Sequence, residues 1–351
     1  MAALLNGNHL TAALSKKLHM NNYIVSCDWG TTEFRLRLIN ITEDIVVGEI
    51  ISQEGVLSIH NQWAAGSKAT SLKAFYLQSL LGQLEGLLDG LSEDCKEVPI
   101  IISGMASSSI GIEEQPYANL PFSLDGKSTV VKFMEKNAAF PFDLLLISGV
   151  RGMNDVMRGE ETQLIGIAQM VESMRLSDDA ICIFPGTHSK HIKISKGQVV
   201  NFKTYITGEL FQLLSTKSVL KGSVSNEHND KVMDEMNLQS FHKGIEQSGN
   251  NSNLLNKLFS VRTNDLFDLL SHQENFFYLS GLLIGCEIRS LEQEPSAQII
   301  LCSGNSMFLL YQLAIEKLNF GQRTIFIQPE MMDKAAFVGQ YQIFQSYQQH
   351  K

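Results

Sequence analysis

The sequence has few of the residues that hold small secreted or metal-dependent proteins together. Of its 351 residues five are cysteines, none of them in a CxxC pair: Cys27, Cys95, Cys182, Cys286 and Cys302. An odd number of cysteines set within apolar runs is typical of reduced, buried thiols rather than of disulfides or a zinc site. We therefore expect a cytoplasmic protein.

Long apolar runs are absent as well, since none approaches the roughly 20 residues that a membrane-spanning helix requires. Residues 1–20 carry no charged segment ahead of a long apolar one, so they do not resemble a signal peptide. We expect these residues to form a loose leader and the folded protein to begin near Met20. The prediction is a protein without membrane association.

Basic residues are outnumbered: 28 lysines and arginines stand against 37 aspartates and glutamates, a formal net charge of -9. No basic face is available to attract nucleic acid, so phosphate ligands would be held by local backbone donors. With only seven prolines and 44% hydrophobic residues, the composition is that of an ordinary globular protein. The nucleotide and hydrolase motifs GxxxxGK[ST], GxGxxG and GxSxG are all missing.

Short apolar runs alternate with amphipathic stretches, which predicts an α/β fold. Strands are expected over 24–27, 34–39, 45–51, 99–102, 144–147, 180–184, 191–194, 199–202, 299–301 and 324–327. Helices are expected over 68–90, 160–174 and 265–291, the last as one buried helix or a pair. Further helices are expected after residue 305, through residue 317, and from about residue 333 to the end. The polar stretch 221–253 is expected to form loops and short helices. A break near residue 176 predicts an N-terminal lobe (21–175), a C-terminal lobe (176–335) and a final helix (336–351) that packs back.

Two predicted hairpins, about 155 residues apart, form a weak internal repeat. The first turns through Asp28-Trp29-Gly30-Thr31-Thr32, and the second follows Pro185-Gly186-Thr187-His188-Ser189-Lys190. Backbone N–H groups and threonine hydroxyls in such turns can converge on phosphate oxygens, and Asp28 can hold Mg²⁺ through its waters. Each turn taken alone could equally be a plain tight turn. The candidate phosphate-binding residues are Gly30, Thr31, Thr32, Gly186, Thr187, His188, Ser189 and Lys190.

A third glycine turn, Ser303-Gly304-Asn305, leads from a strand into a helix, where Gly304 and Asn305 could clasp a nucleotide base or ribose. The order of these three sites resembles the plan of actin-like ATPases and sugar kinases, whose fold is ribonuclease H-like and two-lobed. This resemblance implies that ATP lies in the cleft between the lobes. The spacing of His188 and His191 does not predict a metal site, because no acidic or cysteine partner is near.

Acidic residues crowd the segment Asp155-Val156-Met157-Arg158-Gly159-Glu160-Glu161-Thr162-Gln163. Glutamates in a first helical turn suit the helix dipole, so a solvated helix start is one interpretation. The segment also stands where sugar kinases place a catalytic carboxylate, which makes Asp155, Glu160 and Glu161 candidates for the general base. Alignment of Gly-Glu with the Gly-Asp of sugar kinases favours Glu160, and the loop position favours Asp155, which we rank slightly ahead.

Together with Thr204-Tyr205-Ile206-Thr207-Gly208-Glu209-Leu210-Phe211, these motifs resemble the 2-dehydro-3-deoxygalactonokinase family, from about Tyr23 to the C-terminus. The resemblance implies phosphorylation of 2-keto-3-deoxygalactonate at O6 with Mg-ATP, as a step in galactonate breakdown. Arg158 would suit the planar carboxylate of the acceptor, or form an ion pair with Glu161. Tyr117 could bind sugar hydroxyls or pack in the core. The acceptor residues are expected to be Met105, Ser107, Ser108, Tyr117 and Arg158.

The sequence departs from the family pattern at Ser107-Ser108-Ser109, at Ser148-Gly149-Val150 and at His191. The first departure lies in the lobe expected to hold the sugar acid and bears on substrate identity. A kinase of another sugar acid or sugar, or a non-catalytic ATP-binding sensor, therefore stays open as an alternative. A homodimer also stays open.

Overall fold

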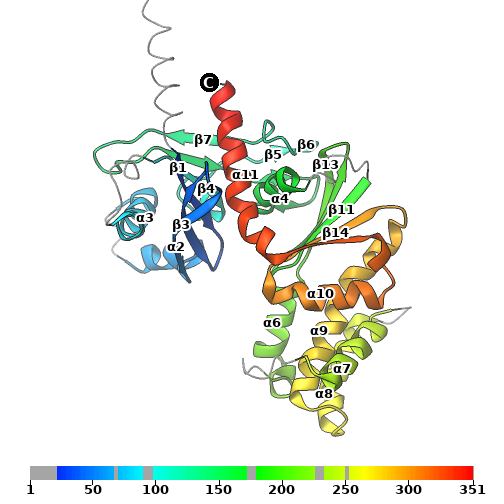
Figure 1. Cartoon of the computed structure of the whole chain (residues 1–351). Coiled ribbons are helices and arrows are strands. Elements are labelled where there is room, and N and C mark those ends of the chain that lie inside the picture. The colour runs from blue at the N-terminus through cyan, green and yellow to red at the C-terminus, as the bar shows by residue number, and fades with distance from the viewer. Residues whose placement is uncertain are drawn as a thin grey trace, which may run out of the picture. The chain divides into compact units, whose positions relative to one another are not determined.

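The computed structural model describes residues 22–66, 70–89, 98–171, 179–225, 233–249 and 253–350 (Figure 1). It divides into unit 1, Met1–Glu172 with Lys334–Lys351, and unit 2, Ser173–Asp333. The leader expected at residues 1–20, and Cys95, lie outside the described residues. Within the described part of the chain, no helix is both long and apolar enough to cross a membrane.

The sheet of unit 1 has the strand order β3-β2-β1-β4-β8-β7. Its strands are β1 (Tyr23–Trp29), β2 (Phe34–Asn40), β3 (Ile45–Ser52), β4 (Ile100–Gly104), β7 (Val131–Met134) and β8 (Leu144–Ile147). β1, β2 and β3 are antiparallel neighbours, whereas β4 is parallel to β1 and β8 is parallel to β4. The predicted first hairpin is therefore confirmed, and β7 is an antiparallel edge strand that the sequence did not predict.

Helices cover the unit 1 sheet: α2 (Val56–Ala65), α3 (Leu72–Leu88), α4 (Glu160–Met170) and α11 (Pro329–His350). The Tyr76 hydroxyl on α3 lies 2.7 Å from the carbonyl oxygens of both Val56 and Ile110, which share its one hydrogen, so α3 closes over the turn that begins α2. On α11, the buried amide of Gln340 donates to the Cys27 carbonyl and to the Ser103 hydroxyl, both at 2.9 Å. Both contacts fix the carboxyl ends of β1 and β4.

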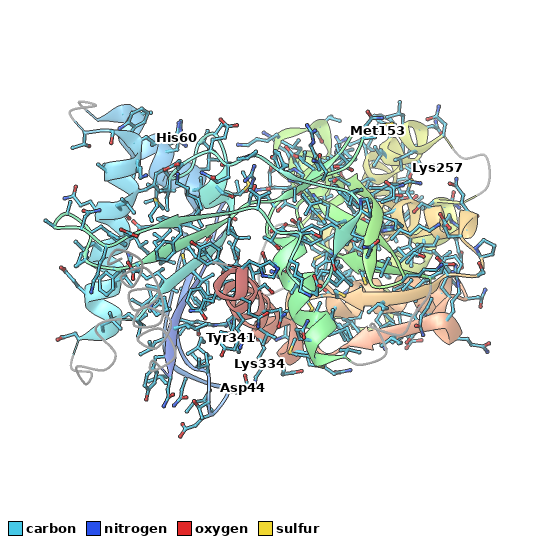
Figure 2. The ribbon with its side chains drawn as sticks, turned by 90° about the horizontal axis from the view of Figure 1, so that it is seen from above. Asp44, His60, Met153, Lys257, Lys334 and Tyr341 are labelled. Carbon is cyan, nitrogen blue, oxygen red and sulfur yellow. The ribbon has the colours of Figure 1, made fainter. Side chains whose placement is uncertain are left out.

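The part of α11 that belongs to unit 1 lies directly against α4. A Cβ added at Gly166 would collide with the Ala335 carbonyl, and one at Gly339 with the Thr162 carbonyl. At the start of this segment, Lys334 Nζ lies 2.8 Å from a carboxylate oxygen of Asp44 (Figure 2).

In unit 2 the strands follow the order β15-β14-β11-β12-β13. They are β11 (Asp179–Phe184), β12 (Ser189–Ser195), β13 (Gln198–Tyr205), β14 (Gln298–Cys302) and β15 (Thr324–Ile327). β11, β12 and β13 are antiparallel neighbours, and β14 and β15 continue the sheet in parallel. Each unit thus has an antiparallel three-stranded meander followed by two parallel strands on the far side of its first strand. This repeated order is that of the actin-like, ribonuclease H-like fold, so the predicted fold class is confirmed.

The described residues of unit 2 also form five α-helices: α6 (Thr207–Lys217), α7 (Glu235–Gln247), α8 (Leu254–Leu266), α9 (His272–Ile288) and α10 (Asn305–Lys317). They form 3-10 turns at Val219–Gly222, Arg289–Gln293 and Gly321–Arg323. α9 is buried on nearly all sides, which explains its lack of amphipathic pattern. Glycines bring α9 onto α7, since a Cβ at Gly281 would collide with the Phe241 carbonyl.

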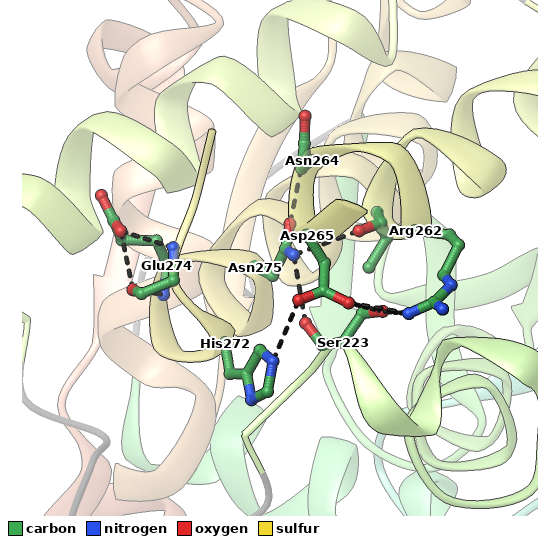
Figure 3. Close-up of polar contacts among 9 residues, drawn as sticks. Ser223, Arg262, Asn264, Asp265, His272, Glu274 and Asn275 are labelled. Atoms are coloured by element: carbon green, nitrogen blue, oxygen red, sulfur yellow. Dashed lines mark hydrogen bonds and ion pairs between the residues drawn. The ribbon is translucent and has the colours of Figure 1, made fainter. Parts of the chain in front are cut away.

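A polar cluster joins the α8 end to the α9 start (Figure 3). Asp265 accepts hydrogen bonds from the Ser223 hydroxyl at 2.7 Å and from Arg262 at 2.8 Å, and its other oxygen lies 3.0 Å from His272 Nε2. The Ser223 hydrogen bond is the largest cause that lowers the pKa of Asp265; His272 and Arg262 act in the same direction and burial opposes them. This cluster is a structural connection between helices.

Several local predictions are wrong. The helices α2, α6 and α8 were not predicted. α7 lies in the stretch that was expected to form loops and short helices, and it is a 13-residue helix whose apolar side chains Phe241 and Ile245 are fully buried. α11 begins at Pro329, earlier than expected. Cys286 is exposed on α9, so it is not one of the buried thiols, whereas Cys27, Cys182 and Cys302 are buried.

Candidate active site

In unit 1 the carboxyl ends of β1 and β4 meet the amino end of α4. Gly104 has φ +87° and Gly159 has φ +116°, conformations that favour glycine. A Cβ at Gly104 would lie 2.6 Å from the Trp29 carbonyl oxygen, and one at Gly159 would lie 3.4 Å from the Gly104 Cα. These two glycines let three chain segments pack together, which brings Asp28 and Glu160 to one place.

The pKa of Asp28 is affected by burial and by four charged side chains. Burial raises its pKa; Arg35 opposes this, while the carboxylates of Glu33 and Glu160 add to it and Arg37 lowers it. Mg²⁺ usually binds through one or two carboxylates together with water and substrate phosphates. Asp28, with Glu160 near enough for their charges to interact, fits such an ion, although no cluster of three metal-ligating side chains exists in the described ranges.

The turn after β1 has its carbonyl groups engaged and its hydroxyl groups free. The amides of Val56 and Leu57 donate to the carbonyl oxygens of Gly30 and Thr31, at 2.9 and 3.1 Å, which locks the turn to the start of α2. Thr31 and Thr32 are exposed. Among the described residues their hydroxyls have no protein partner, so they are free to bind a ligand.

The predicted acceptor residues Ser107, Tyr117 and Arg158 come together. Arg158 Nη1 donates to the Ser107 carbonyl at 2.7 Å and to its hydroxyl at 2.6 Å, and the guanidinium carbon lies 4.2 Å from the centre of the Tyr117 ring. Ser107 and Ser108 are buried, and the Ser108 hydroxyl donates to the Met105 carbonyl at 2.7 Å. The predicted ion pair between Arg158 and Glu161 is not among the contacts of the described residues; Arg158 instead fixes the loop after β4.

The three candidate carboxylates have different environments. Glu161 is buried, and its oxygens accept hydrogen bonds from the Gly159 N–H at 2.8 and 3.0 Å and from the Thr162 hydroxyl at 3.1 Å. One oxygen of Glu160 accepts from the Arg158 N–H at 3.1 Å. Asp155 is in the loop that precedes α4, where it accepts from the Val156 N–H at 2.7 Å and lines a pocket. Glu161 therefore caps the helix, and Glu160 and Asp155 are the more accessible groups.

We expect Glu161 to make the protein less stable at alkaline pH. Burial first, and then the Glu160 charge, raises the pKa of Glu161 to about 8, against about 4.3 for an unperturbed glutamate. Between these values the folded protein holds a proton that the unfolded chain releases, so the free energy of unfolding falls as pH rises. Denaturant titrations from about pH 5 to about pH 9 should show this decline, and Glu161→Gln, which stays neutral, should flatten it. If the free energy of unfolding fell equally with pH in the native protein and in Glu161→Gln, the raised pKa of Glu161 would be contradicted.

In unit 2 the predicted phosphate turn packs against the amino end of α6. The Glu209 N–H donates to the Thr187 carbonyl at 3.0 Å, and a Cβ at Gly208 would lie 2.5 Å from the Gly186 carbonyl oxygen. The exposed His188 ring lies 2.7 Å from a Glu209 carboxylate oxygen. Gly186 has open space around its Cα, so a ligand can approach the backbone closely.

The residues after this turn face inward. Ser189 is fully buried and its hydroxyl donates to the Glu287 carboxylate at 2.7 Å, so this side chain is committed to the protein core. Lys190 is buried to a similar degree, and its Nζ lies 3.5 Å from the His188 carbonyl. His191 Nε2 also lies 3.0 Å from Glu287, so His188 and His191 have different partners. Gly304 and Asn305 lie exposed at the start of α10, directly after β14.

Sequence reasoning missed two groups of residues. Glu287, Thr207 and Tyr311 form the buried centre behind the unit 2 turn, and Asn119, Arg151 and Asn154 line the unit 1 pocket that also contains Asp155. Glu287 lies in the apolar second half of α9, where a carboxylate among apolar side chains was the one available signal. Asn119 and Arg151 are exposed polar residues on very short strands, and no local pattern distinguishes them.

A family model described as 2-keto-3-deoxy-galactonokinase matches residues 28–339. The chain is 28% identical over 302 residues to the 2-dehydro-3-deoxygalactonokinase of Escherichia coli (strain K12), which covers 83% of this chain and 89% of that protein. It is 29% identical over 313 residues to the Rhizobium meliloti (strain 1021) protein named "Probable 2-dehydro-3-deoxygalactonokinase DgoK1". That alignment covers 86% of this chain and 92% of that protein. A crystal structure described as a proposed 2-dehydro-3-deoxygalactonokinase from Sinorhizobium meliloti aligns with a TM-score of 0.72 at 26% identity, over 93% of this chain and 99% of that one. Since the family model spans most of its length, the chain belongs to the 2-keto-3-deoxy-galactonokinase family.

Proposed function

We propose that this protein transfers the γ-phosphoryl group of ATP to O6 of 2-keto-3-deoxygalactonate. The observation that carries the proposal is the packing of Gly159, directly before Glu160, on Gly104 beside the Asp28 carboxylate, within a chain that matches the kinase family over residues 28–339. Phosphoryl transfer requires positioning and charge stabilisation more than covalent chemistry from the protein. The cytoplasm is the expected place of action, since thiols stay reduced there.

Glu160 is the general base in this proposal, because it begins α4 at the end of the sheet and its charge raises the pKa of Asp28. It accepts the proton of the acceptor hydroxyl as that oxygen bonds to the γ-phosphorus and the bond from the γ-phosphorus to the leaving ADP breaks. Asp28 would hold a magnesium ion through water, and such an ion would supply positive charge to the phosphates. Thr31 and Thr32 in unit 1, with the backbone of Gly186 and Thr187 and the His188 side chain in unit 2, bind phosphate oxygens. Gly304 and Asn305 bind the adenosine.

The acceptor site in this proposal is formed by the loop that starts at Met105 and by Tyr117. Arg158 holds that loop through Ser107, at 2.7 and 2.6 Å. The loop contains the serine run that departs from the family pattern, so it is also where the identity of the sugar acid is decided.

An ADP-release assay with Mg-ATP tests this function on 2-keto-3-deoxygalactonate, its gluconate epimer, the parent aldonates and common hexoses. We expect turnover of the galactonate derivative at a rate of about 1–100 s⁻¹, and loss of that turnover when Mg²⁺ is chelated. If the enzyme turned over only a different sugar or sugar acid, that compound would replace 2-keto-3-deoxygalactonate as the proposed substrate. Bound ATP without turnover of any acceptor would favour a non-catalytic sensor.

A further inference from the structure

A small sheet in unit 1 presents side chains that the roles above leave unused. It has the order β10-β9-β5, formed by β5 (Ala118–Asn119), β9 (Val150–Arg151) and β10 (Val156–Met157). Strand pairing sets Asn119 beside Arg151, and Arg151 beside Val156. Side chains alternate along a strand, so these three share one face, and all three are exposed. Their neighbours on the opposite face are buried: Ala118, Val150 and Met157.

This exposed face forms the floor of a pocket of about 680 Å³. The pocket is lined by Asn119, Leu120, Arg151, Gly152, Met153, Asn154, Asp155 and Val156. Met153, which is labelled in Figure 2, is 96% exposed. The volume is within the usual range for small-molecule sites.

The guanidinium group of Arg151 is held in a defined orientation inside this pocket. Its Nε donates to Asn119 Oδ1 at 2.8 Å. Because Nε is only a donor, the Asn119 carbonyl oxygen must be the atom that faces it. In the described part of the chain the terminal nitrogens of Arg151 and the amide nitrogen of Asn119 have no protein acceptor. The pocket therefore offers a planar, charged set of donors that matches a carboxylate.

The other arginine near the acceptor loop is differently placed. Arg158 Nη1 already has two acceptors on Ser107, and its face is covered by the Tyr117 ring. Its Nε is buried and has no hydrogen-bond partner in the described part of the chain. Arg151, in contrast, is exposed in the pocket.

We propose that the pocket over the β10-β9-β5 sheet binds the carboxylate end of the sugar acid, with Arg151 as the anion-binding residue and Asn119 as its positioning residue. The inference rests on the proposed function, since it assigns an anchor for the acceptor of that reaction. Asn154 and Asp155, which line the same pocket, are available to the sugar hydroxyls.

Discrimination between the sugar acid and its neutral primary amide tests the proposal, both as KM in the ADP-release assay and as binding by calorimetry without ATP. We expect the native enzyme to prefer the acid, and Arg151→Gln to raise the KM for the acid by about 10- to 100-fold with a much smaller change in kcat. The variant should bind acid and amide alike. Arg151→Lys should recover part of the preference, and Asn119→Ala should lose part of it, because the charge remains while its orientation is relaxed.

Lys127→Gln is the matched control, since it removes one positive charge from a 57% exposed side chain outside the pocket. It should leave the acid preference unchanged. If Arg151→Gln retained the native preference while the native enzyme phosphorylated the sugar acid, the Arg151 assignment alone would be overturned. A native enzyme that bound and phosphorylated only neutral sugars would overturn both the proposed substrate and this anchor.

Discussion

Glu160→Gln is expected to lower kcat by about 10²- to 10⁴-fold, because glutamine cannot accept the proton of the attacking hydroxyl. The substitution keeps the shape of the side chain, and an amide oxygen can still accept from the Arg158 N–H, as the Glu160 carboxylate does at 3.1 Å. KM for ATP should change little. Single-turnover measurement of phosphorylated product, with ATP affinity measured separately, provides the check.

Asp155→Asn separates the two accessible carboxylates. Asp155 lines the pocket over the small sheet, so we expect its substitution to raise the KM for the sugar acid more than it lowers kcat. The reverse pattern, with Asp155→Asn inactive and Glu160→Gln turning over normally, would make Asp155 the base. That result would restore the ranking that the sequence alone favoured.

The choice between these carboxylates shows what local sequence can and cannot predict here. The two hairpins were predictable because strand periodicity and turn residues are local signals, and their repetition pointed to the two-unit fold. The proximity of Glu160 to Asp28 depends instead on two glycines with positive φ, Gly104 and Gly159, that join distant segments. No spacing rule reports such a contact.

Unit 2 gives a second example of the same limit. The sequence grouped Ser189 with the phosphate-binding residues because it follows Gly186 and Thr187. In the structure its hydroxyl is directed toward Glu287, 98 residues along the chain. A local motif gives the residue types that a site needs, but burial decides which of them face a ligand.

Substitution of Glu287 is expected to cause a large loss of stability. Its carboxylate is 2% exposed and accepts from Ser189 at 2.7 Å and from Tyr311 at 2.8 Å, with the Thr207 hydroxyl and His191 as further partners. These groups come from β12, α6 and α10, so one carboxylate ties the elements around the unit 2 phosphate turn. Glu287→Ala leaves them without their common acceptor, which should cost about 3–5 kcal/mol in the free energy of unfolding.

Thermal unfolding and nucleotide binding together test this role. For a protein of 351 residues the loss corresponds to a fall in Tm of about 4–7 °C. Glu292→Ala is the matched control, because Glu292 is 57% exposed in the turn after α9 and should change Tm little. Since Ser189 begins β12 and Thr207 begins α6, ATP affinity measured well below the Tm should also fall in Glu287→Ala. If Glu287→Ala had the Tm of the native protein, Glu287 would not be needed to hold these elements together. A lowered Tm with native ATP affinity would show that the turn keeps its shape without Glu287, and nucleotide binding would then depend on the contacts between Thr187 and Glu209 instead.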